Sequence, residues 1–527
     1  MFIFGFYSGS FVIEAENDMK RRDFLQGMAV LGGGMLLSRM PAMAATGQPQ
    51  QQSGIQIGDV LANSAIVWGR SDRPARMWVE WDTDDRFAQP RRVRGPWALS
   101  PSDFTSRVEL IDLPAGRRIH VRVGYSDAGN GELSEWVAGS FVTAPTAVGP
   151  VRFLWSGDTA GQGFGINPEL GGMKIYRTMA EQEPDFFVHS GDTIYADGPI
   201  PERIEVEDGK VWKNLVTPEV SKVAETLNEF RGRYRYNLMD ENVRLFNSRV
   251  AQIWQWDDHE VVNNYSASKD LSGDARYQVK STTLLQARAT RAFFDYAPIR
   301  RSGPEGSEQI YRSLPFGPLL DRFVLDMRSY RGPNTENLQT KPGTDTAILG
   351  GTQVDWLLAQ LKASTATWKA VFCDMPLGLQ VADGETRWEA VANGDHGPAK
   401  GRELEIARLL KGIKDAGIEN LVWFTADVHY TAAHYYDPAR ASFNDFAPFW
   451  EFVSGPLNAG SFGPGKPDDT FGLQVVYEKS PATQNLSPLA ELQFFGQVDI
   501  DAESRAMTVI LKDLNNDTLF TKVLHPA

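Results

Sequence analysis

Residues 185–195 read DFFVHSGDTIY, an apolar run that ends in a glycine and a carboxylate. Short runs of large apolar residues are typical of strands buried on both faces of a parallel sheet. Helical patterns lie between such runs, so we predict an α/β domain. Four further apolar runs also end in carboxylate, imidazole or guanidinium side chains: VRFLWSGD (151–158), VAQIWQWDDHE (250–260), RFVLDMR (322–328) and LVWFTADVH (421–429).

The polar residues after these runs are expected to meet, because ligands bind beyond the carboxyl ends of the strands in an α/β sheet. Several carboxylates in one place require cations to neutralise them. Carboxylates with an imidazole suit iron, manganese, zinc, magnesium or calcium, and two such ions can activate water against a phosphoryl group. A single aspartate after a strand is more often a helix N-cap, but five such strand ends favour a site. The predicted metal ligands are Asp158, Asp192, Asp258, Asp427 and His429.

Tyr195, three residues after Asp192, adds a phenolic oxygen that suits ferric iron. Of the seven histidines, His259 lies between two acids and is predicted to function, whereas His189 on its apolar run is predicted to be a core or supporting residue. His396 lies in a loop-like segment, where it either lines the mouth of the site or is incidental. The single cysteine, Cys373, excludes internal disulfides and is predicted to be buried.

The chain of 527 residues is long enough for two or more domains. Residues 1–45 are predicted to be a targeting segment with the expected start at Met19, because Arg21 and Arg22 precede a short apolar stretch as in a twin-arginine signal. Residues 53–146 alternate apolar and polar residues between turn signals and predict an Ig/fibronectin-like β-sandwich. The catalytic α/β domain is predicted to span 150–527. The formal charge of −14 provides no overall field for nucleic acid, and no transmembrane partner is indicated.

The chain resembles the PhoD-like alkaline phosphatases, a family of the calcineurin-like metallophosphoesterases. The resemblance extends from about residue 53 to the C-terminus and lies in the order of its motifs: SGDTIYAD (190–197), WDDHEVVNN (256–264), DMRSYR (326–331) and ADVH (426–429). It implies a four-layer α/β/β/α domain with two metals, of the Ca²⁺ and Fe³⁺ type. Where some members have a cysteine ligand, this chain has Asp158, so Zn²⁺, Mn²⁺ or Mg²⁺ are alternatives.

By position, the resemblance implies that Asp192 bridges the metals, with Tyr195, Asp427 and His429 as further ligands. Asp258 matches the usual asparagine ligand of the superfamily, and Asn263 is a competing candidate for that place. His259 would protonate the leaving oxygen, and Arg328 would neutralise phosphate charge.

The sequence therefore predicts an enzyme exported to the periplasm or secreted, with the twin-arginine export machinery as a partner. It would hydrolyse small phosphate monoesters, and also diesters, by metal-activated hydroxide for phosphate acquisition. Two alternatives remain at this stage. One is a phosphodiesterase or phospholipase D-like enzyme on the same site, and the other is a non-catalytic secreted protein whose β-sandwich binds a surface polymer.

Overall fold

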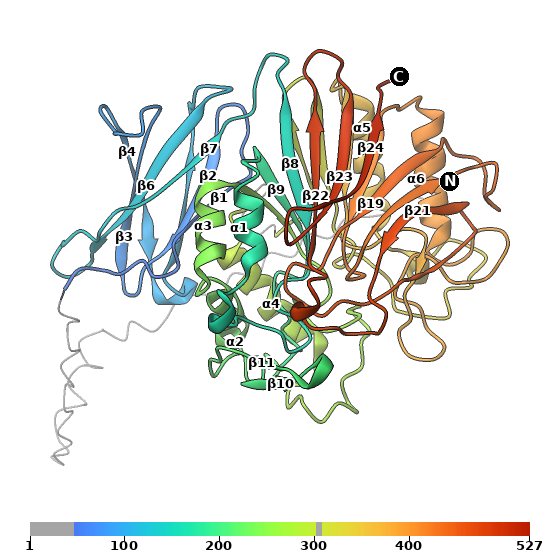
Figure 1. Cartoon of the computed structure of the whole chain (residues 1–527), viewed down its shortest axis with the longest axis horizontal. Helices are drawn as coiled ribbons and strands as arrows, with labels where there is room; N and C mark the ends of the chain where they lie inside the picture. The colour runs from blue at the N-terminus through green and yellow to red at the C-terminus, as the bar shows by residue number, and fades with distance from the viewer. Residues whose placement is uncertain (1–46, 302–307) are drawn as a thin grey trace, which may run out of the picture. The chain divides into compact units, whose positions relative to one another are not determined.

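The computed structural model describes residues 47–301 and 308–527 (Figure 1). The predicted targeting segment, residues 1–45, lies outside the described residues. Within the described residues, no helix has both the length and the apolar character needed to cross a bilayer.

The first seven strands form the predicted Ig/fibronectin-like β-sandwich. Three of them, β1, β2 and β5, make one layer, and the other four make a separate sheet in the order β4-β3-β6-β7. Alternation of apolar and polar residues explains the packing, since the apolar side of each strand faces the other layer. The bounds are β1 Ile55–Gly58, β2 Ala65–Arg70, β3 Ala75–Asp82, β4 Arg91–Ala98, β5 Thr105–Leu110, β6 Arg118–Asp127 and β7 Val137–Val142.

A nine-stranded sheet joins this sandwich to the rest of the chain. Its order is β24-β23-β22-β8-β9-β12-β1-β2-β5, with β8, β9 and β12 parallel and β1 paired in parallel with β12. The sheet therefore crosses the predicted boundary between 146 and 150, and the domain limits stay predictions. The new strands are β8 Val151–Ser156, β9 Phe186–Ser190, β12 Ala251–Gln255, β22 Phe494–Ile500, β23 Met507–Asp513 and β24 Thr518–Leu524.

A second, seven-stranded sheet has the order β13-β14-β15-β17-β19-β18-β21. Strands β14, β15, β17 and β19 are parallel neighbours. Its strands are β13 Arg312–Phe316, β14 Leu320–Val324, β15 Trp368–Phe372, β17 Leu421–Thr425, β18 Thr431–Tyr436, β19 Phe449–Val453 and β21 Leu473–Lys479. Two short antiparallel pairs complete the strands: β10 Arg203–Glu205 with β11 Val211–Lys213, and β16 Leu379–Gln380 with β20 Lys466–Pro467.

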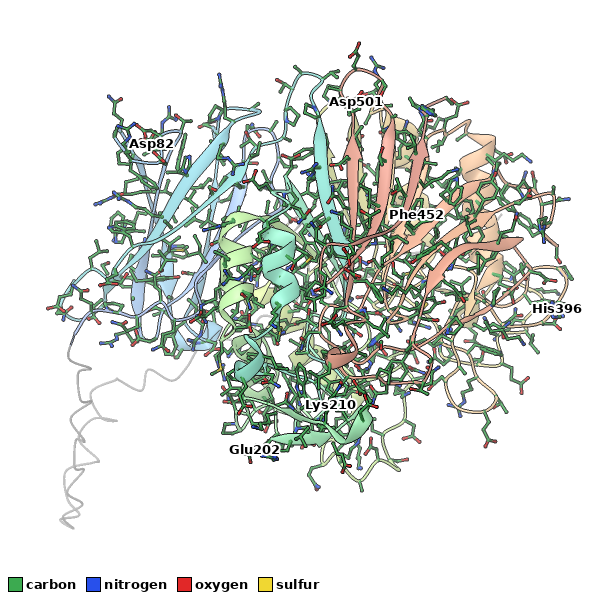
Figure 2. The ribbon with its side chains drawn as sticks, in the orientation of Figure 1. Asp82, Glu202, Lys210, His396, Phe452 and Asp501 are labelled. Carbon is green, nitrogen blue, oxygen red and sulfur yellow. The ribbon has the colours of Figure 1, made fainter. Side chains whose placement is uncertain are left out.

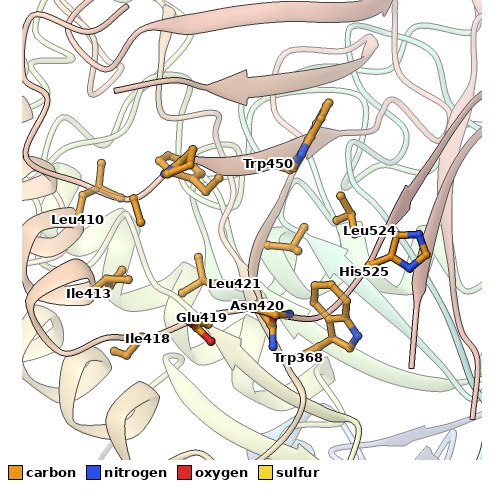
Figure 3. A pocket seen from close by; sticks show the side chains of 15 residues that line it. Trp368, Leu410, Ile413, Ile418, Glu419, Asn420, Leu421, Trp450, Leu524 and His525 are labelled. Carbon is orange, nitrogen blue, oxygen red and sulfur yellow. The ribbon is translucent and has the colours of Figure 1, made fainter. Parts of the chain in front are cut away.

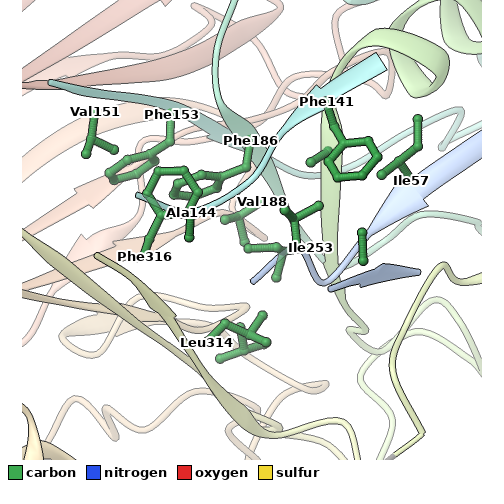
Figure 4. Close-up of a cluster of buried hydrophobic side chains, with 14 of the residues drawn as sticks. Ile57, Phe141, Ala144, Val151, Phe153, Phe186, Val188, Ile253, Leu314 and Phe316 are labelled. Carbon is green, nitrogen blue, oxygen red and sulfur yellow. The ribbon is translucent and has the colours of Figure 1, made fainter. Parts of the chain in front are cut away.

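The two large sheets pack face to face between two helical layers, which is the predicted four-layer α/β/β/α arrangement. Phe153 of β8 stacks on Phe186 of β9 with ring centroids 5.0 Å apart and meets Phe372 and Phe424 of the other sheet edge-on (Figure 4). The same apolar core runs on into the sandwich, where Ile57 and Phe141 belong to it. This continuity explains why the sandwich and the sheets pack as one body.

Helices cover the outer face of each sheet. The nine-stranded sheet is covered by α1 to α4, whose apolar residues pack with Leu154, Phe187 and Trp254, and the seven-stranded sheet by α5 and α6. Helices α2 and α3 are separate, because Asp240 caps the start of α3 with its side chain. The helices are α1 Lys174–Ala180, α2 Leu227–Asn237, α3 Glu241–Arg249, α4 Thr282–Tyr296, α5 Gly351–Ala363 and α6 Glu403–Asp415.

An apolar cavity of about 310 Å³ lies at the amino ends of β15, β17 and β19 (Figure 3). Trp368, Leu421 and Trp450 line it, together with Leu524 near the chain end. This cavity has no cluster of ionisable side chains, so we expect the functional site at the opposite, carboxyl ends of these strands.

Candidate metal centre

Four strand ends bring the predicted ligands together. Asp158 follows β8, Asp192 follows β9, Asp258 follows β12, and Asp427 with His429 follows β17. The first three strands belong to the nine-stranded sheet and the fourth to the facing sheet. The site therefore lies where the carboxyl ends of two stacked sheets meet.

The loops after these strands turn sharply. Asp158, Asp192, Asp427 and His429 all have left-handed backbone conformations, with φ of 67°, 52°, 67° and 59°. Such values are uncommon for residues other than glycine and cluster at functional sites. Gly191 has φ of 98°, and a Cβ there would come within 2.4 Å of the Asp257 side chain, so only glycine fits this turn.

The ligand atoms of Asp158, Asp192 and His429 lie within 4.8 Å of one another. His429 Nδ1 is 2.5 Å from the carbonyl oxygen of Gly460 and donates to it, which leaves Nε2 as the basic nitrogen. Nε2 lies 2.8 Å from the Tyr195 hydroxyl and 3.7 Å from Asp158 Oδ1. Burial lowers the pKa of His429 to about 4, so the imidazole is neutral, as a metal ligand must be.

Two further groups of ligand atoms meet the same distance limit. Asp192, Asp258 and His259 form one, and Asp257, Asp258 and Asp427 form the other. Asp192 belongs to two of the three groups and Asp258 also to two, so each can serve two neighbouring cations. This placement is what a bridging carboxylate needs.

Asp158 provides the test of whether metals fit. Both of its carboxylate oxygens are buried without a hydrogen-bond partner. Burial, and the nearby charge of Asp427, raise its pKa well above the usual range, and burial raises that of Asp192 in the same way. Buried, unpartnered carboxylates are costly unless a cation is bound, so the residues present fit two or more metal ions. Oxygen donors with an imidazole leave the choice among the hard and borderline metals open.

Tyr195 lies in the loop that follows β9, and its hydroxyl contacts His429 of the first ligand group. Burial and the charge of Asp192 raise the pKa of its phenol well above the usual value in the absence of a cation. Its ring packs on Gly161, where an added Cβ would come within 2.4 Å of the ring. The absence of a side chain at Gly161 therefore lets the backbone approach this tyrosine closely.

Glu260 orders the loops rather than serving as a ligand. Its carboxylate accepts three backbone N–H groups, those of Asp192 at 3.1 Å, Thr193 at 2.6 Å and Asp257 at 2.8 Å. It thereby ties the β9 loop to the β12 loop and fixes two ligand-bearing turns relative to each other. The sequence showed its position next to His259 but gave no sign of these bonds.

His259 is held as a cation beside the metal ligands. Its Nδ1 lies 2.7 Å from Asp197 Oδ1, and its Nε2 lies 4.0 Å from Asp258 Oδ1. Burial opposes the charge, yet the carboxylates of Asp197, Asp258 and Asp192 raise the pKa of His259 well above its usual value. Asp197 was not predicted as a site residue, although it ends the SGDTIYAD motif.

Arg328 lies behind the site rather than at its surface. The residue is 1% exposed, and its guanidinium contacts four carboxylates: Asp374 at 2.9 Å, Asp427 at 3.4 Å, and Asp257 and Glu389. Burial opposes the charge, but the facing Asp257 and Glu389 raise the pKa of Arg328 well above the usual range. These contacts support a role in positioning Asp427; direct contact with phosphate stays a prediction.

A cavity of about 360 Å³ opens over the ligands. Among the described residues, no lysine or arginine lines it, and its walls carry neutral amides beside the acids. Asn263 is one of these wall residues, but its side-chain amide donates to Asn264, 2.8 Å away. The lining comprises Gln162, Asp192, Asp258, His259, Asn263, Asn264, Gln380, Val381, Ala382, Glu389, Asp427, Val428, His429, Tyr430, Phe462, Gly463, Pro464, Gly465 and Gln484.

The other histidines and the cysteine lie apart from this cavity. His396 is exposed on an outer loop and pairs with Asp469, 3.0 Å away (Figure 2). His189 is buried, with Nε2 3.0 Å from the Thr159 hydroxyl, and burial lowers its pKa to about 3. Cys373 is a buried free thiol, as predicted.

Comparisons with known proteins agree with this architecture. Residues 153–511 match the PhoD-like phosphatase family, and residues 38–145 match the PhoD-like phosphatase N-terminal domain. Alkaline phosphatase D of Bacillus subtilis (strain 168) is 27% identical over 486 residues, which cover 86% of this chain and 79% of that protein.

Two solved structures share the fold over most of the chain. The structure of PhoD has a TM-score of 0.66 at 20% identity and covers 91% of this chain and 90% of its own. The purple acid phosphatase from yellow lupin (Lupinus luteus) seeds has a TM-score of 0.57 at 12% identity, covering 90% and 74%. At these identities the likeness shows the fold.

Proposed function

The chain belongs to the PhoD-like phosphatase family, whose members are phosphoric ester hydrolases, and on this premise we propose that it is a metal-dependent phosphatase of monoesters and diesters. The observation that carries the proposal is the sharing of carboxylates: Asp192 is grouped with Asp158 and His429 and lies beside Asp258, and Asp258 is in turn grouped with Asp427. Asp192, Asp258, Asp427 and His429 line one cavity. Metal ions bound there would polarise a phosphoryl oxygen and lower the pKa of a coordinated water.

Other residues of the chain position the ligands or transfer the proton. Glu260 and Arg328 fix the loops, so that Asp192 and Asp427 are held in place before substrate arrives. His259, kept protonated by Asp197, presents Nε2 to the cavity and donates its proton to the leaving oxygen. Its positive charge also stabilises negative charge that develops on the ester.

The charge of the cavity wall independently supports hydrolysis of diesters. A monoester brings two negative charges and a diester one. Because no lysine or arginine among the described residues lines the cavity, His259 is the cationic side chain available to the second charge of a monoester. Phosphodiesterase activity is therefore the second candidate, and neutral amides beside the ligands suit an uncharged second ester group.

We further propose Ca²⁺ with Fe³⁺ as the metals, with Zn²⁺, Mn²⁺ or Mg²⁺ as alternatives, and Tyr195 as the phenolate ligand of a ferric ion. Export by the twin-arginine machinery to the periplasm or medium, and phosphate acquisition there, rest on Arg21 and Arg22 and on the short apolar stretch after them.

The test is hydrolysis of p-nitrophenyl phosphate and of bis(p-nitrophenyl) phosphate by the metal-loaded chain at mildly alkaline pH. Asp192→Asn should abolish both activities while the thermal unfolding midpoint of the metal-free protein stays within a few degrees, because one buried carboxylate among several is removed. A preference for the monoester supports a phosphatase, and a preference for the diester supports the second candidate. Full activity of metal-loaded Asp192→Asn would overturn the assignment of the site.

A further inference from the structure

The outer face of the four-stranded sheet carries a row of arginines stacked between aromatic rings. In order, the row is Arg94, Trp78, Arg92, Trp136, Arg122 and Phe87, and we call it the arginine ladder. Each guanidinium lies over its neighbouring ring at a centroid distance of 4.5–6.0 Å. Arg76 stacks on Trp97 in the same way beside it, at 5.2 Å.

Strand register explains why these side chains share one face. Along β3, Ala75, Met77 and Val79 are buried in the sandwich core, so Arg76, Trp78 and Glu80 point outward. Pairing of β3 with β4 places Arg76 opposite Trp97, Trp78 opposite Arg94 and Glu80 opposite Arg92. Pairing with β6 places Glu80 opposite Arg122. The row thus runs across β3, β4 and β6, the strands labelled in the blue part of the chain (Figure 1).

One carboxylate lies within the row. Glu80 is 3% exposed and accepts from Arg92 Nε at 2.7 Å and from Arg122 Nε at 2.6 Å, so a single negative charge serves two arginines. Asp82, at the end of β3 (Figure 2), is used by its own hairpin, where it accepts the backbone N–H groups of Thr83, Asp84 and Gln89. Among the described residues, no carboxylate pairs with Arg76 or Arg94.

The face is therefore positive on a chain that is strongly negative. Arg76, Arg92, Arg94 and Arg122 with Glu80 carry a net charge of +3, whereas the whole chain carries −14. Stacking on the rings holds each guanidinium flat. Arg92 and Arg122 each turn their Nε edge to Glu80, so a partner would be met by their remaining N–H groups and by Arg76 and Arg94. Planar, immobilised guanidinium groups in a row are suited to oxygen anions repeated along an extended chain.

The row also indicates which part of a partner is recognised. Trp78 and Trp136 each have arginines stacked over them, so their faces are occupied and are not open to nucleobases. Recognition is left to hydrogen bonds from guanidinium N–H groups to backbone phosphate oxygens. Trp97, 42% exposed, is the large apolar side chain that this face presents, which is little for insertion into a lipid surface.

We propose that the arginine ladder binds a soluble linear phosphodiester polymer through its backbone, without recognition of bases. This binding lies on the sandwich and requires no residue of the metal centre, so it goes beyond the proposed hydrolysis of small esters. In function it would hold a polymeric phosphate ester on the enzyme independently of turnover.

The test is fluorescence anisotropy with the Asp192→Asn chain, in which the probe stays intact. The probe is an abasic oligodeoxyribonucleotide of about 16 units, which carries the phosphodiester backbone alone. A neutral-backbone oligomer and anionic phospholipid vesicles serve as the alternative probes. With about three charges engaged, the logarithm of the association constant should fall with the logarithm of salt concentration with a slope of about −2.

Variants on the face give changes in opposite directions. The double variant Arg76→Gln/Arg94→Gln should weaken binding of the abasic probe at least tenfold. It should also make the salt dependence shallower, with a slope whose magnitude is about 1 or smaller. Glu80→Gln removes the internal anion, so it should strengthen binding several-fold, a gain that misfolding cannot produce. Arg203→Gln on β10, an exposed arginine on a distant strand, is the matched control and should change affinity less than twofold.

Hydrolysis of p-nitrophenyl phosphate by the same face variants, made with Asp192 intact, should stay within twofold of the parent chain. Absence of binding to the abasic probe at low salt would overturn the proposal even if the chain is an active phosphatase. Binding only of base-containing oligomers, or only of vesicles, would also overturn it and would indicate base recognition or a membrane surface instead. Weaker binding by Glu80→Gln would contradict the charge argument.

Discussion

Replacing Asp197 by asparagine removes one negative charge beside His259 with little change in side-chain volume. Burial alone would raise the pKa of Asp197, yet the contact with His259 and the N–H of Asn263 lower it from 3.8 to about 2. That shift of about 2 units corresponds to about 2–3 kcal/mol in favour of the anion. Because an interaction between two charges acts on both, the pKa of His259 should fall in Asp197→Asn.

The assay compares leaving groups across pH. In the parent chain, kcat/KM for an alkyl phosphate should decline at the alkaline pH where His259 loses its proton. In Asp197→Asn that decline should begin at a lower pH. At alkaline pH the variant should hydrolyse the alkyl ester about 10- to 100-fold more slowly, because alkoxide leaves poorly without a proton. p-Nitrophenyl phosphate should be affected far less, since nitrophenolate leaves without protonation.

Asp445→Asn, which alters a surface carboxylate paired with Lys411 and Lys414, is the control and should leave both profiles unchanged. Equal losses for both leaving groups, or an alkaline limb that does not move, would refute the assignment of His259 as the proton donor supported by Asp197.

The remaining predictions concern metals, the buried arginine and acid stability. Dialysis against a chelator should abolish hydrolysis and lower the thermal unfolding midpoint, because Asp158 and the neighbouring carboxylates lose the cations that neutralise them. Calorimetry measures the midpoint, and added metal should restore activity. Activity that persists in verified metal-free protein would contradict this prediction. Arg328→Gln should lower the free energy of unfolding, measured by denaturant titration, by about 3–5 kcal/mol, because it leaves several buried carboxylates unpaired. Unchanged stability with weaker phosphate binding would instead indicate that Arg328 contacts the substrate. The pKa of His189 is lowered from 6.5 to about 3 by burial, so its contribution to stability is present above pH 6.5 and is lost as pH falls through this range, by about 1.4 kcal/mol per pH unit. His189→Gln should flatten that acid dependence in urea titrations at several pH values, and a slope equal to that of the parent chain would count against this reading.

Much of the site could be predicted because strand ends leave a local trace in sequence. Apolar runs that stop at Asp158, Asp192 and Asp427 predicted both the strands and their convergence, and the structure places these carboxylates together. The positions of His189 in the core and of Cys373 as a buried thiol followed from similar local patterns. Hydrophobic periodicity indicates which face of an element is buried, and the burial of these two residues follows from that local pattern.

What could not be predicted depends on pairings between distant segments. The parallel pairing of β1 with β12, which merges sandwich and catalytic sheet, joins residues nearly 200 positions apart and leaves no periodic signal. The burial of Arg328 among four carboxylates is equally non-local, as those partners come from four different segments.

The central claim is that the overlapping carboxylate and imidazole groups hold a multi-metal hydrolytic centre built on Asp192. Metal content per chain, measured by plasma mass spectrometry on the purified protein and on Asp192→Asn after equal loading and desalting, tests it most directly. We predict two or more metal ions per chain in the parent protein and the loss of at least one in the variant, because Asp192 serves two ligand groups. Equal metal content in both proteins, or none in an active parent chain, would contradict the claim.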